Sequence, residues 1–406
     1  MHDRLYVLYR LSAQGTVNST RPMTVEPPRF VGPTGLAKQK ILAIIVRDMG
    51  PFNGTKRFVR DLQGSDNRFT AYELKNPERF RRGLVSRIYR LTLEPIANLV
   101  AIRRIRADGF LAASPFEGTL ALALRKHPLG VLCFDMSEWS TQTTQPFKRR
   151  LWRLWWRVNG LVAYRQADVV FCPTDFVRNS FQMKIGRTSP SVLLEPRLSE
   201  SFIESCRLSR SLTTRVERTL PRALVFVMVS GDLSPEKCIT HVIEGISWFL
   251  KTANFHSTIL KIVGRGSDAE KEQLKARAAA GGINLEFLDG PNDSDLIDLY
   301  VGADSLIETS IFDWFNYPPL EALACGTPVV YATPLSNVGI FEGVVAKCSL
   351  DRDSIAKAIA QVVSPDADFQ RRTAAGTDMV CKSTMQDVAN EIYRNYFNAK
   401  GNEQQG

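Results

Sequence analysis

The chain of 406 residues has no long uncharged apolar run. It contains no stretch of about eighteen consecutive apolar residues, so a membrane-spanning helix is not expected. Its start, MHDRLYVLYRLSAQG, interrupts a short apolar segment with Arg4 and Arg10 and has no cleavage site typical of a secretory signal. We therefore expect a cytoplasmic protein.

Histidine and cysteine are too few and too scattered to indicate a metal centre or a disulfide framework. The four histidines form no cluster with ligand spacing, and the seven cysteines have no close pair and stand mostly within apolar segments. We expect reduced, mostly buried thiols, no metal and no cofactor. Three pairs of acids at helix starts predict helix caps rather than metal ligands. They are Asp293/Asp295, Asp351/Asp353 and Asp366/Asp368.

The composition leaves little room for disorder. Apolar residues make up 44% of the chain, aromatic residues 9% and charged residues 23%, which is ordinary for soluble globular proteins. The length suggests two domains, each with its own core. Only residues 1–40, rich in Ser, Thr, Pro and Gly, indicate a disordered or loosely packed extension.

Acidic residues are scarce in the first half of the chain. Residues 1–222 carry 37 Lys and Arg against 18 Asp and Glu, whereas residues 223–406 carry 15 against 24. The net charge of +10 therefore divides into +19 and −9. A basic half favours an anionic partner, either a membrane or a nucleic acid, although an unselected surface bias would look the same. We expect an anionic membrane surface and no nucleic acid, because nothing but this charge supports the latter.

Residues 146–162, PFKRRLWRLWWRVNGLV, contain no acid and place tryptophan beside arginine. On a helix, the arginines lie on one face and an apolar row on another. Such a helix can lie in the headgroup layer of an anionic bilayer, or its apolar row can pack on the sheet of its own domain. The predicted membrane-facing residues are Arg149, Trp152, Arg153, Trp156 and Arg157, and the apolar row is Leu151, Leu154, Trp155, Val158 and Val162.

Short apolar segments alternate with helical patterns along the chain, which predicts an α/β fold of two Rossmann-like, doubly wound domains facing each other across a cleft. The expected domains are residues 41–196 and 223–383, with a linker at 197–222 and a C-terminal helix and tail at 384–406 that crosses back to the first domain. The expected strands are 41–47, 110–114, 129–134, 168–173, 191–195, 223–231, 258–264, 283–288, 304–309 and 327–333.

Ligands of doubly wound sheets bind beyond the carboxyl ends of the strands, so the turns after strands are the candidate sites. A turn that opens a helix offers free backbone N–H groups to an anion, and a lysine there can pair with a phosphate. The turns with suggestive residues are Asn53-Gly54, SGDLSPEK with Lys237, and Gly264-Arg265-Gly266.

The most specific stretch is SIFDWFNYPPLEALACGTPVV, residues 310–330. Asp313 falls in its loop, and Glu321 falls on the helix that Pro318 and Pro319 begin. A carboxylate there can accept ribose hydroxyls while loop amides face a sugar or its phosphate. Alternatively, the acid only complements the dipole of its helix.

Five elements follow one another in residues 224–360. They are Gly231-Asp232-Leu233 with Lys237, Ile262-Val263-Gly264-Arg265-Gly266, Phe287 to Gly290, Ala303-Asp304, and Ser310 to Val330 with Asp313, Pro318 and Glu321. In this order they resemble the donor-binding domain of GT-B fold glycosyltransferases, especially the large retaining group called family four. The first half is similar in layout, with Asn53-Gly54 where the family often has Gly-Gly.

The resemblance implies transfer of a sugar from a nucleotide-sugar, with the anomeric configuration retained and without an essential metal. Lys237 would neutralise the departing diphosphate, Asp313 would contact the sugar near its reacting carbon, and Glu321 would hold the ribose. The other donor-binding residues that we predict are Asn53, Gly54, Gly264, Arg265, Ser310, Trp314, Phe315 and Asn316.

The sequence departs from the family pattern at several positions. Asp232 stands where the family has a phosphate-binding arginine, and Arg265, one strand over, can substitute for it. The first Glu of the family is shortened to Asp313. Phe134-Asp135 replaces a frequent histidine, which makes Asp135 a third catalytic candidate through contacts with the acceptor. Alternatively, this carboxylate at the end of a strand is only a turn or cap residue.

The expected function is transfer of a sugar to a lipid-linked or cell-surface glycan at the inner face of the plasma membrane. The basic first domain would dock on the membrane and present the acceptor, and the acidic second domain would hold the donor. The alternative is a catalytically weakened GT-B protein that binds nucleotide or scaffolds a glycan-assembly complex. Asp232 and the missing histidine favour this alternative.

Overall fold

The computed structural model describes most of the chain between residues 39 and 397. The predicted extension, residues 1–40, therefore lies almost entirely outside the described residues. The described residues are 39–47, 54–74, 93–134, 136, 139, 147–186, 190–212, 223–253, 255, 257–310, 317–332 and 339–397.

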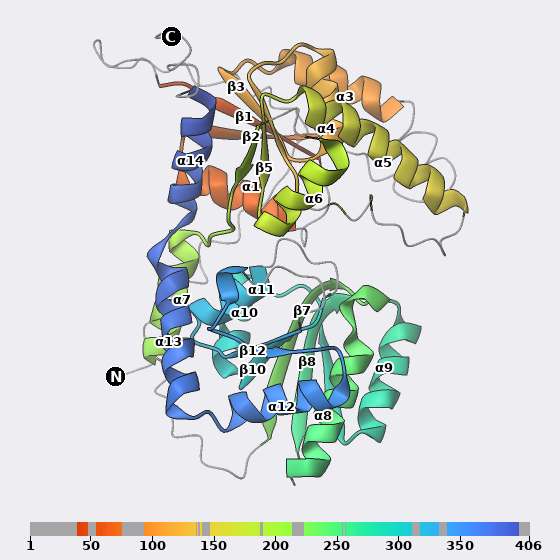
Figure 1. Ribbon diagram of the computed structural model, residues 1–406, viewed down its shortest axis with the longest axis vertical. Coiled ribbons are helices and arrows are strands. Elements are labelled where there is room, and N and C mark those ends of the chain that lie inside the picture. The colour runs from red at the N-terminus through yellow and green to blue at the C-terminus, as the bar shows by residue number, and fades with distance from the viewer. Residues whose placement is uncertain are drawn as a thin grey trace, which may run out of the picture. The chain divides into compact units, whose positions relative to one another are not determined.

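The first sheet of the described residues is parallel, has the strand order β2-β1-β3-β4-β5-β6 and is flanked by helices (Figure 1). β1 is a continuous, buried apolar run, as expected for a strand covered on both faces. Because β2 and β3 lie on opposite sides of β1, the strand order reverses between β1 and β3. The elements are β1 (Leu42–Arg47), α1 (Gly54–Ser65), β2 (Phe69–Leu74), α3 (Leu93–Arg104), β3 (Gly109–Ala112), α4 (Pro115–Ala123), β4 (Leu129–Leu132), α5 (Phe147–Gln166), β5 (Val169–Cys172), α6 (Asp175–Ile185) and β6 (Ser191–Leu193).

The second sheet of the described residues is also parallel, with the order β12-β11-β10-β7-β8-β9. Its order reverses between β7 and β10, which is the switch point of this sheet. The elements are β7 (Leu224–Asp232), the 3-10 helix η3 (Pro235–Lys237), α8 (Ile239–Ala253), β8 (Thr258–Arg265), α9 (Asp268–Ala280), β9 (Ile283–Leu288), α10 (Asp293–Gly302), β10 (Ser305–Glu308), α11 (Tyr317–Ala324), β11 (Val329–Ala332), η4 (Gly339–Phe341), β12 (Ala346–Cys348) and α12 (Arg352–Val363).

Three further helices lie in the two segments through which the chain crosses from the first sheet to the second and back, which we call the crossing segments. They are α7 (Glu200–Leu212), α13 (Ala367–Lys382) and α14 (Met385–Phe397). The two crossing segments contact each other, because the backbone N–H of Met385 donates to the carbonyl of Leu198 at 2.9 Å. α14 then packs on the first sheet, where the Tyr396 hydroxyl donates to the carbonyl of Phe110 and Asn390 accepts from Arg68.

Several elements differ from the sequence-based prediction. Residues 197–222, which the composition indicates as a linker, contain α7, because Phe202, Ile203 and Cys206 form a buried stripe on it. The helix expected from about residue 235 to 250 is broken at Cys238, whose φ of 53° is left-handed. β2, β12 and α3 were not among the predicted elements, whereas α12 and α13 begin at the helix starts that the acid pairs at Asp351 and Asp366 predict.

The cysteines follow the prediction of reduced and mostly buried thiols. All seven are free, and Cys381 alone among them is half-buried rather than buried. The Sγ atoms of Cys206 on α7 and Cys325, just after α11, lie 3.0 Å apart in the core. This contact packs the crossing segment against the second sheet.

Candidate functional site

Lys237 and Ser310 meet at the switch point of the second sheet. Lys237 ends the 3-10 helix that follows β7, and Ser310 follows β10. The Lys237 ammonium donates to the Ser310 Oγ at 3.0 Å, and the Thr309 hydroxyl donates to the Lys237 carbonyl at 2.9 Å. The backbone N–H of Ser310 in turn donates to buried Glu308 at 2.9 Å. Two residues predicted from separate motifs are thus in direct contact, beyond the carboxyl ends of two neighbouring strands.

The glycine turn after β8 packs against the turn after β7. A Cβ on Gly264 would lie 3.0 Å from the carbonyl oxygen of Ser230, and one on Gly266 would collide with Leu233. Arg265, between the two glycines, is exposed and pairs in register with Asp232. The Asp232 carboxylate accepts from the Ser234 N–H at 3.1 Å, so this acid has a local role in the turn.

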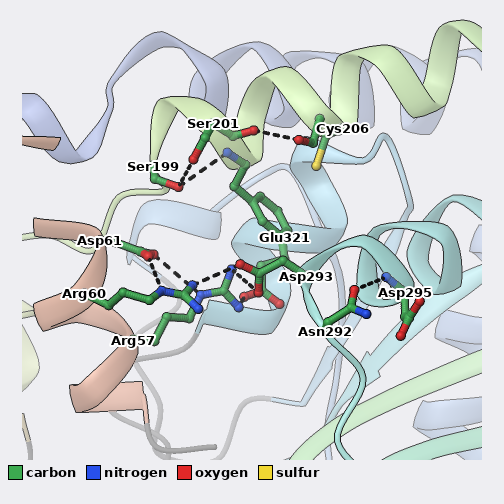
Figure 2. Close-up of polar contacts among 12 residues, drawn as sticks. Arg57, Arg60, Asp61, Ser199, Ser201, Cys206, Asn292, Asp293, Asp295 and Glu321 are labelled. Atoms are coloured by element: carbon green, nitrogen blue, oxygen red, sulfur yellow. Dashed lines mark hydrogen bonds and ion pairs between the residues drawn. The ribbon is translucent and has the colours of Figure 1, made fainter. Parts of the chain in front are cut away.

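Glu321 lies on α11 and is almost completely buried (Figure 2). One of its oxygens accepts from the Tyr300 hydroxyl on α10 at 2.7 Å. The other forms an ion pair with Arg57, which comes from α1 beside the first sheet. Burial raises the pKa of Glu321, while the charge of Arg57 and the hydrogen bond from Tyr300 oppose the shift.

Arg57 was not predicted from the sequence, yet it has the densest set of contacts in this region. Its guanidinium lies 5.0 Å from the ring centroid of Phe202 and 5.3 Å from that of Tyr317. Burial lowers the pKa of Arg57, but Glu321 and the nearby aspartates outweigh burial and raise it, so the group stays charged. Asp61 and Asp293 lie 3.6 and 3.9 Å from it.

The neighbouring Arg60 makes a second link from α1 to α10. Its guanidinium contacts Asp293 and Asp61 at 3.0 Å each, and Figure 2 shows both arginines pointing toward Asp293. Burial raises the pKa of Asp61 against the effect of Arg57 and Arg60. No single motif signals these contacts, because their members come from distant parts of the chain.

Six predicted site residues lie outside the described residues, so their roles remain predictions. Gly54 is described and is the exposed first residue of α1. Those outside the described residues are Asn53, Asp135, Asp313, Trp314, Phe315 and Asn316.

The first sheet has a buried polar cluster at its own switch point. Arg47 ends β1 and pairs with Glu94 of α3 at 2.6 Å, while Ser114 and Glu117 follow β3. The Ser114 hydroxyl donates to one oxygen of Glu117. Within the described part of the chain, the other Glu117 oxygen, one Glu94 oxygen and the amide nitrogen of Asn98 lack hydrogen-bond partners. Burial raises the pKa of Glu117 to about 7.

This cluster was not predicted, although Ser114-Pro-Phe-Glu117 has the spacing of a capping box. The predicted helix caps are confirmed for Asp351 and Asp366, whose side chains accept from N–H groups three residues ahead. At α10 the cap is Asn292, one residue before Asp293. The described residues contain no group of three or more His, Cys, Asp and Glu that is arranged to hold a metal.

The outward surface of α5 differs from the expected one. Trp155 and Trp156 pack partly against the core, with Trp155 5.0 Å from the Phe116 ring, while Leu154 and Val158 are more than half exposed. Of the two alternatives for the apolar row, packing on the sheet therefore holds for Trp155 but not for Leu154 and Val158, and Trp156, which was predicted to face the membrane, packs partly against the core. Arg153 and Arg157 are half-buried. The side chains of Arg149, Leu151 and Trp152 lie outside the described residues.

α3 has a similar exposed pair, Ile96 and Val100, one turn apart and followed by exposed Arg103 and Arg104. Both helices pack against α4. None of the helices that the structure describes combines the length and the apolar character needed to cross a bilayer.

Part of the chain is similar in sequence to known glycosyltransferases. Residues 213–377 match the family described as glycosyl transferases group 1. The chain is 29% identical over 154 residues to O-antigen chain mannosyltransferase B of Escherichia coli, which is 37% of this chain and 40% of that protein. It is 27% identical over 209 residues to a GDP-mannose-dependent alpha-(1-6)-phosphatidylinositol dimannoside mannosyltransferase of Mycobacterium tuberculosis, 51% of this chain and 52% of that protein. The matches thus span about half or less of these curated relatives.

A solved structure covers more of the chain. The crystal structure of Anabaena HepE in complex with UDP and glucose superposes with a TM-score of 0.65 over 87% of this chain and 98% of that chain, at 15% identity. A likeness at this identity shows the fold, and the two parallel sheets agree with the predicted pair of Rossmann-like domains. The chain has the GT-B fold, and its residues 213–377 match the model of the glycosyl transferases group 1 family.

Proposed function

We propose that this protein is a glycosyltransferase that moves a sugar from a nucleotide-sugar to a glycan or lipid-linked acceptor, with retention and without a metal. The contact of Lys237 with Ser310 at the second switch point is the observation that supports this most, because it places a fixed cation where α/β sheets bind ligands. Both residues belong to the segment that matches the family.

In the proposed reaction, the bond from the anomeric carbon to the diphosphate breaks, and a bond to an acceptor hydroxyl oxygen forms on the same face of the sugar. The hydroxyl proton leaves with the nucleoside diphosphate. Negative charge grows on the leaving group, so the Lys237 ammonium stabilises the transition state more than the ground state. Glu321 binds the ribose, and Asp313 contacts the donor sugar.

The proposed donor carries mannose, with GDP-mannose the first candidate. Support comes from the names of the two curated relatives, both mannosyltransferases and one of them GDP-mannose-dependent. A thermal-shift panel of GDP, UDP, ADP, dTDP and their common sugars tests the donor class. At a ligand concentration 100 times the Kd, the expected stabilisation is about 2.7 kcal/mol, seen as a raised midpoint.

We expect a selective shift with the guanosine ligands, followed by GDP release when membrane extract supplies acceptor. A selective shift with another nucleotide would mean that the donor carries that nucleotide instead of GDP. Binding of nucleotide without any release of diphosphate would instead favour the scaffold alternative. A folded protein that responds to no nucleotide would contradict the proposal.

We also propose that the first domain docks on the anionic inner face of the plasma membrane. Leu154 and Val158 on α5 offer exposed apolar surface beside the arginines of that helix. Burying one such side chain contributes about 1.5–3 kcal/mol, so we expect Leu154→Glu to weaken binding to phosphatidylserine-rich vesicles roughly tenfold or more.

Vesicle flotation at moderate salt measures this effect. Leu208→Glu is the matched control, because Leu208 is similarly exposed but lies on α7. Equal flotation of the two variants, or no flotation of the unmodified protein, would contradict membrane docking through α5.

A further inference from the structure

The Glu321 carboxylate is covered on both sides in this structure. It is 1% exposed, with one oxygen held by the Tyr300 hydroxyl and the other by the Arg57 guanidinium. A carboxylate has about four lone-pair sites, so it has accepting capacity left for further donors. At this burial, however, no ligand hydroxyl reaches those sites unless a neighbouring side chain moves away.

The two partners of Glu321 differ in how easily they can leave. Tyr300 is fully buried on α10, in the same sheet-and-helix unit as Glu321, and its movement would disturb the core. Arg57 comes from α1, which flanks the other sheet, and has alternative carboxylates within reach at Asp61 and Asp293. The Asp293 side chain already pairs with Arg60 at 3.0 Å, but it is 49% exposed, so it can hold a second guanidinium without further burial.

Two aromatic rings cover Arg57 and link it to the neighbouring elements. Phe202 belongs to the crossing helix α7, and Tyr317 is the first residue of α11. A change in the position of Arg57 therefore changes packing at the crossing segment as well as at Glu321. Figure 2 shows Arg57 between the carboxylates of Asp61 and Glu321, with Asp293 beside it.

We propose that Arg57 is a gating residue for the donor: it covers Glu321 in the empty protein and transfers to Asp293 and Asp61 when a nucleoside ribose binds. This inference rests on the proposed function, which puts the ribose at Glu321. The donor must displace a charged pair before its hydroxyls can bind, and its apparent affinity is reduced by the fraction of covered protein. The exchange links donor binding to the contact between the two sheet-and-helix units.

Calorimetric titration of wild type, Arg57→Met and Arg60→Met with GDP-mannose, GDP and UDP tests the gate. We expect Arg57→Met to bind its nucleotide on the order of tenfold more tightly than wild type, within the usual range of coupling between two equilibria. Arg60→Met is the matched control, because it loses the same charge and contacts Asp61 and Asp293 but not Glu321. Its affinity should rise less than that of Arg57→Met, because Arg57 still covers Glu321 in this variant.

Arginine side-chain NMR of the wild-type protein provides a second readout that does not depend on the affinities of the two methionine variants. The Nε–H resonance of Arg57, assigned by comparison with Arg57→Lys, should shift when the nucleotide saturates the protein. An unchanged resonance in the saturated protein overturns the gate, as does Arg57→Met binding no more tightly than Arg60→Met. If wild type and both variants bind none of the three nucleotides, the proposed function fails and the gate fails with it.

Discussion

Replacing Lys237 by Met is expected to lower the turnover number about 100- to 1,000-fold, the usual effect of removing one transition-state electrostatic contact. The Lys237 ammonium, at the end of the 3-10 helix η3, is held 3.0 Å from Ser310, and a methionine of similar length keeps the packing but removes the charge. Because charge on the diphosphate grows during bond cleavage, the loss falls mainly on the turnover number, and donor affinity changes less.

Initial rates of GDP release from GDP-mannose, measured with membrane extract as the acceptor source, give this number. Lys275→Met is the control, because Lys275 is exposed on α9 and pairs with Glu272 of the same helix. An unchanged turnover number in Lys237→Met would show that the Lys237 charge does not stabilise the transition state. An equal loss in both variants would show an effect of charge on the domain as a whole.

Much of the fold could be predicted because its strands are short apolar runs in strict alternation with helices. β1 and β7 are recognisable from composition alone, since strands covered on both faces need apolar side chains at every position. β2, FTAYEL, escaped prediction because it lies at the edge of its sheet and is mostly half-buried. α7 was not predicted because its Ser- and Arg-rich composition obscures a buried stripe of only three residues.

The residues of the candidate site also differ in whether the sequence alone could predict them. Lys237 and Ser310 were predictable because local rules place both after strands, and the parallel topology then brings their side chains together. Arg57 was not predictable, since its meaning depends on Glu321, Phe202 and Tyr317, which are brought near it only by tertiary packing. Glu117 has a local capping signal, but its burial depends on the helices that pack around α4.

Replacing Glu117 by Gln is expected to flatten the dependence of stability on pH. Burial raises the pKa of Glu117 to about 7 in the folded protein, whereas the unfolded chain has the ordinary value of 4.5. Between these values the folded state binds more protons, so the free energy of unfolding falls as pH rises and levels off above pH 7. At 1.36 kcal/mol per pKa unit, the stability lost by wild type between pH 4.5 and pH 8 through this group is about 3 kcal/mol.

Urea unfolding of wild type and Glu117→Gln at several values between pH 4.5 and pH 8 measures the difference. Between pH 4.5 and pH 8, the free energy of unfolding of the variant should rise relative to that of wild type by up to about 3 kcal/mol, because a neutral amide has no charge to bury. Glu272→Gln, at an exposed position on α9, should follow wild type at every pH. If the curves for Glu117→Gln and wild type run parallel, Glu117 is ionised throughout. The pair of Arg47 and Glu94 would then have to accommodate a second buried negative charge at the switch point of the first sheet.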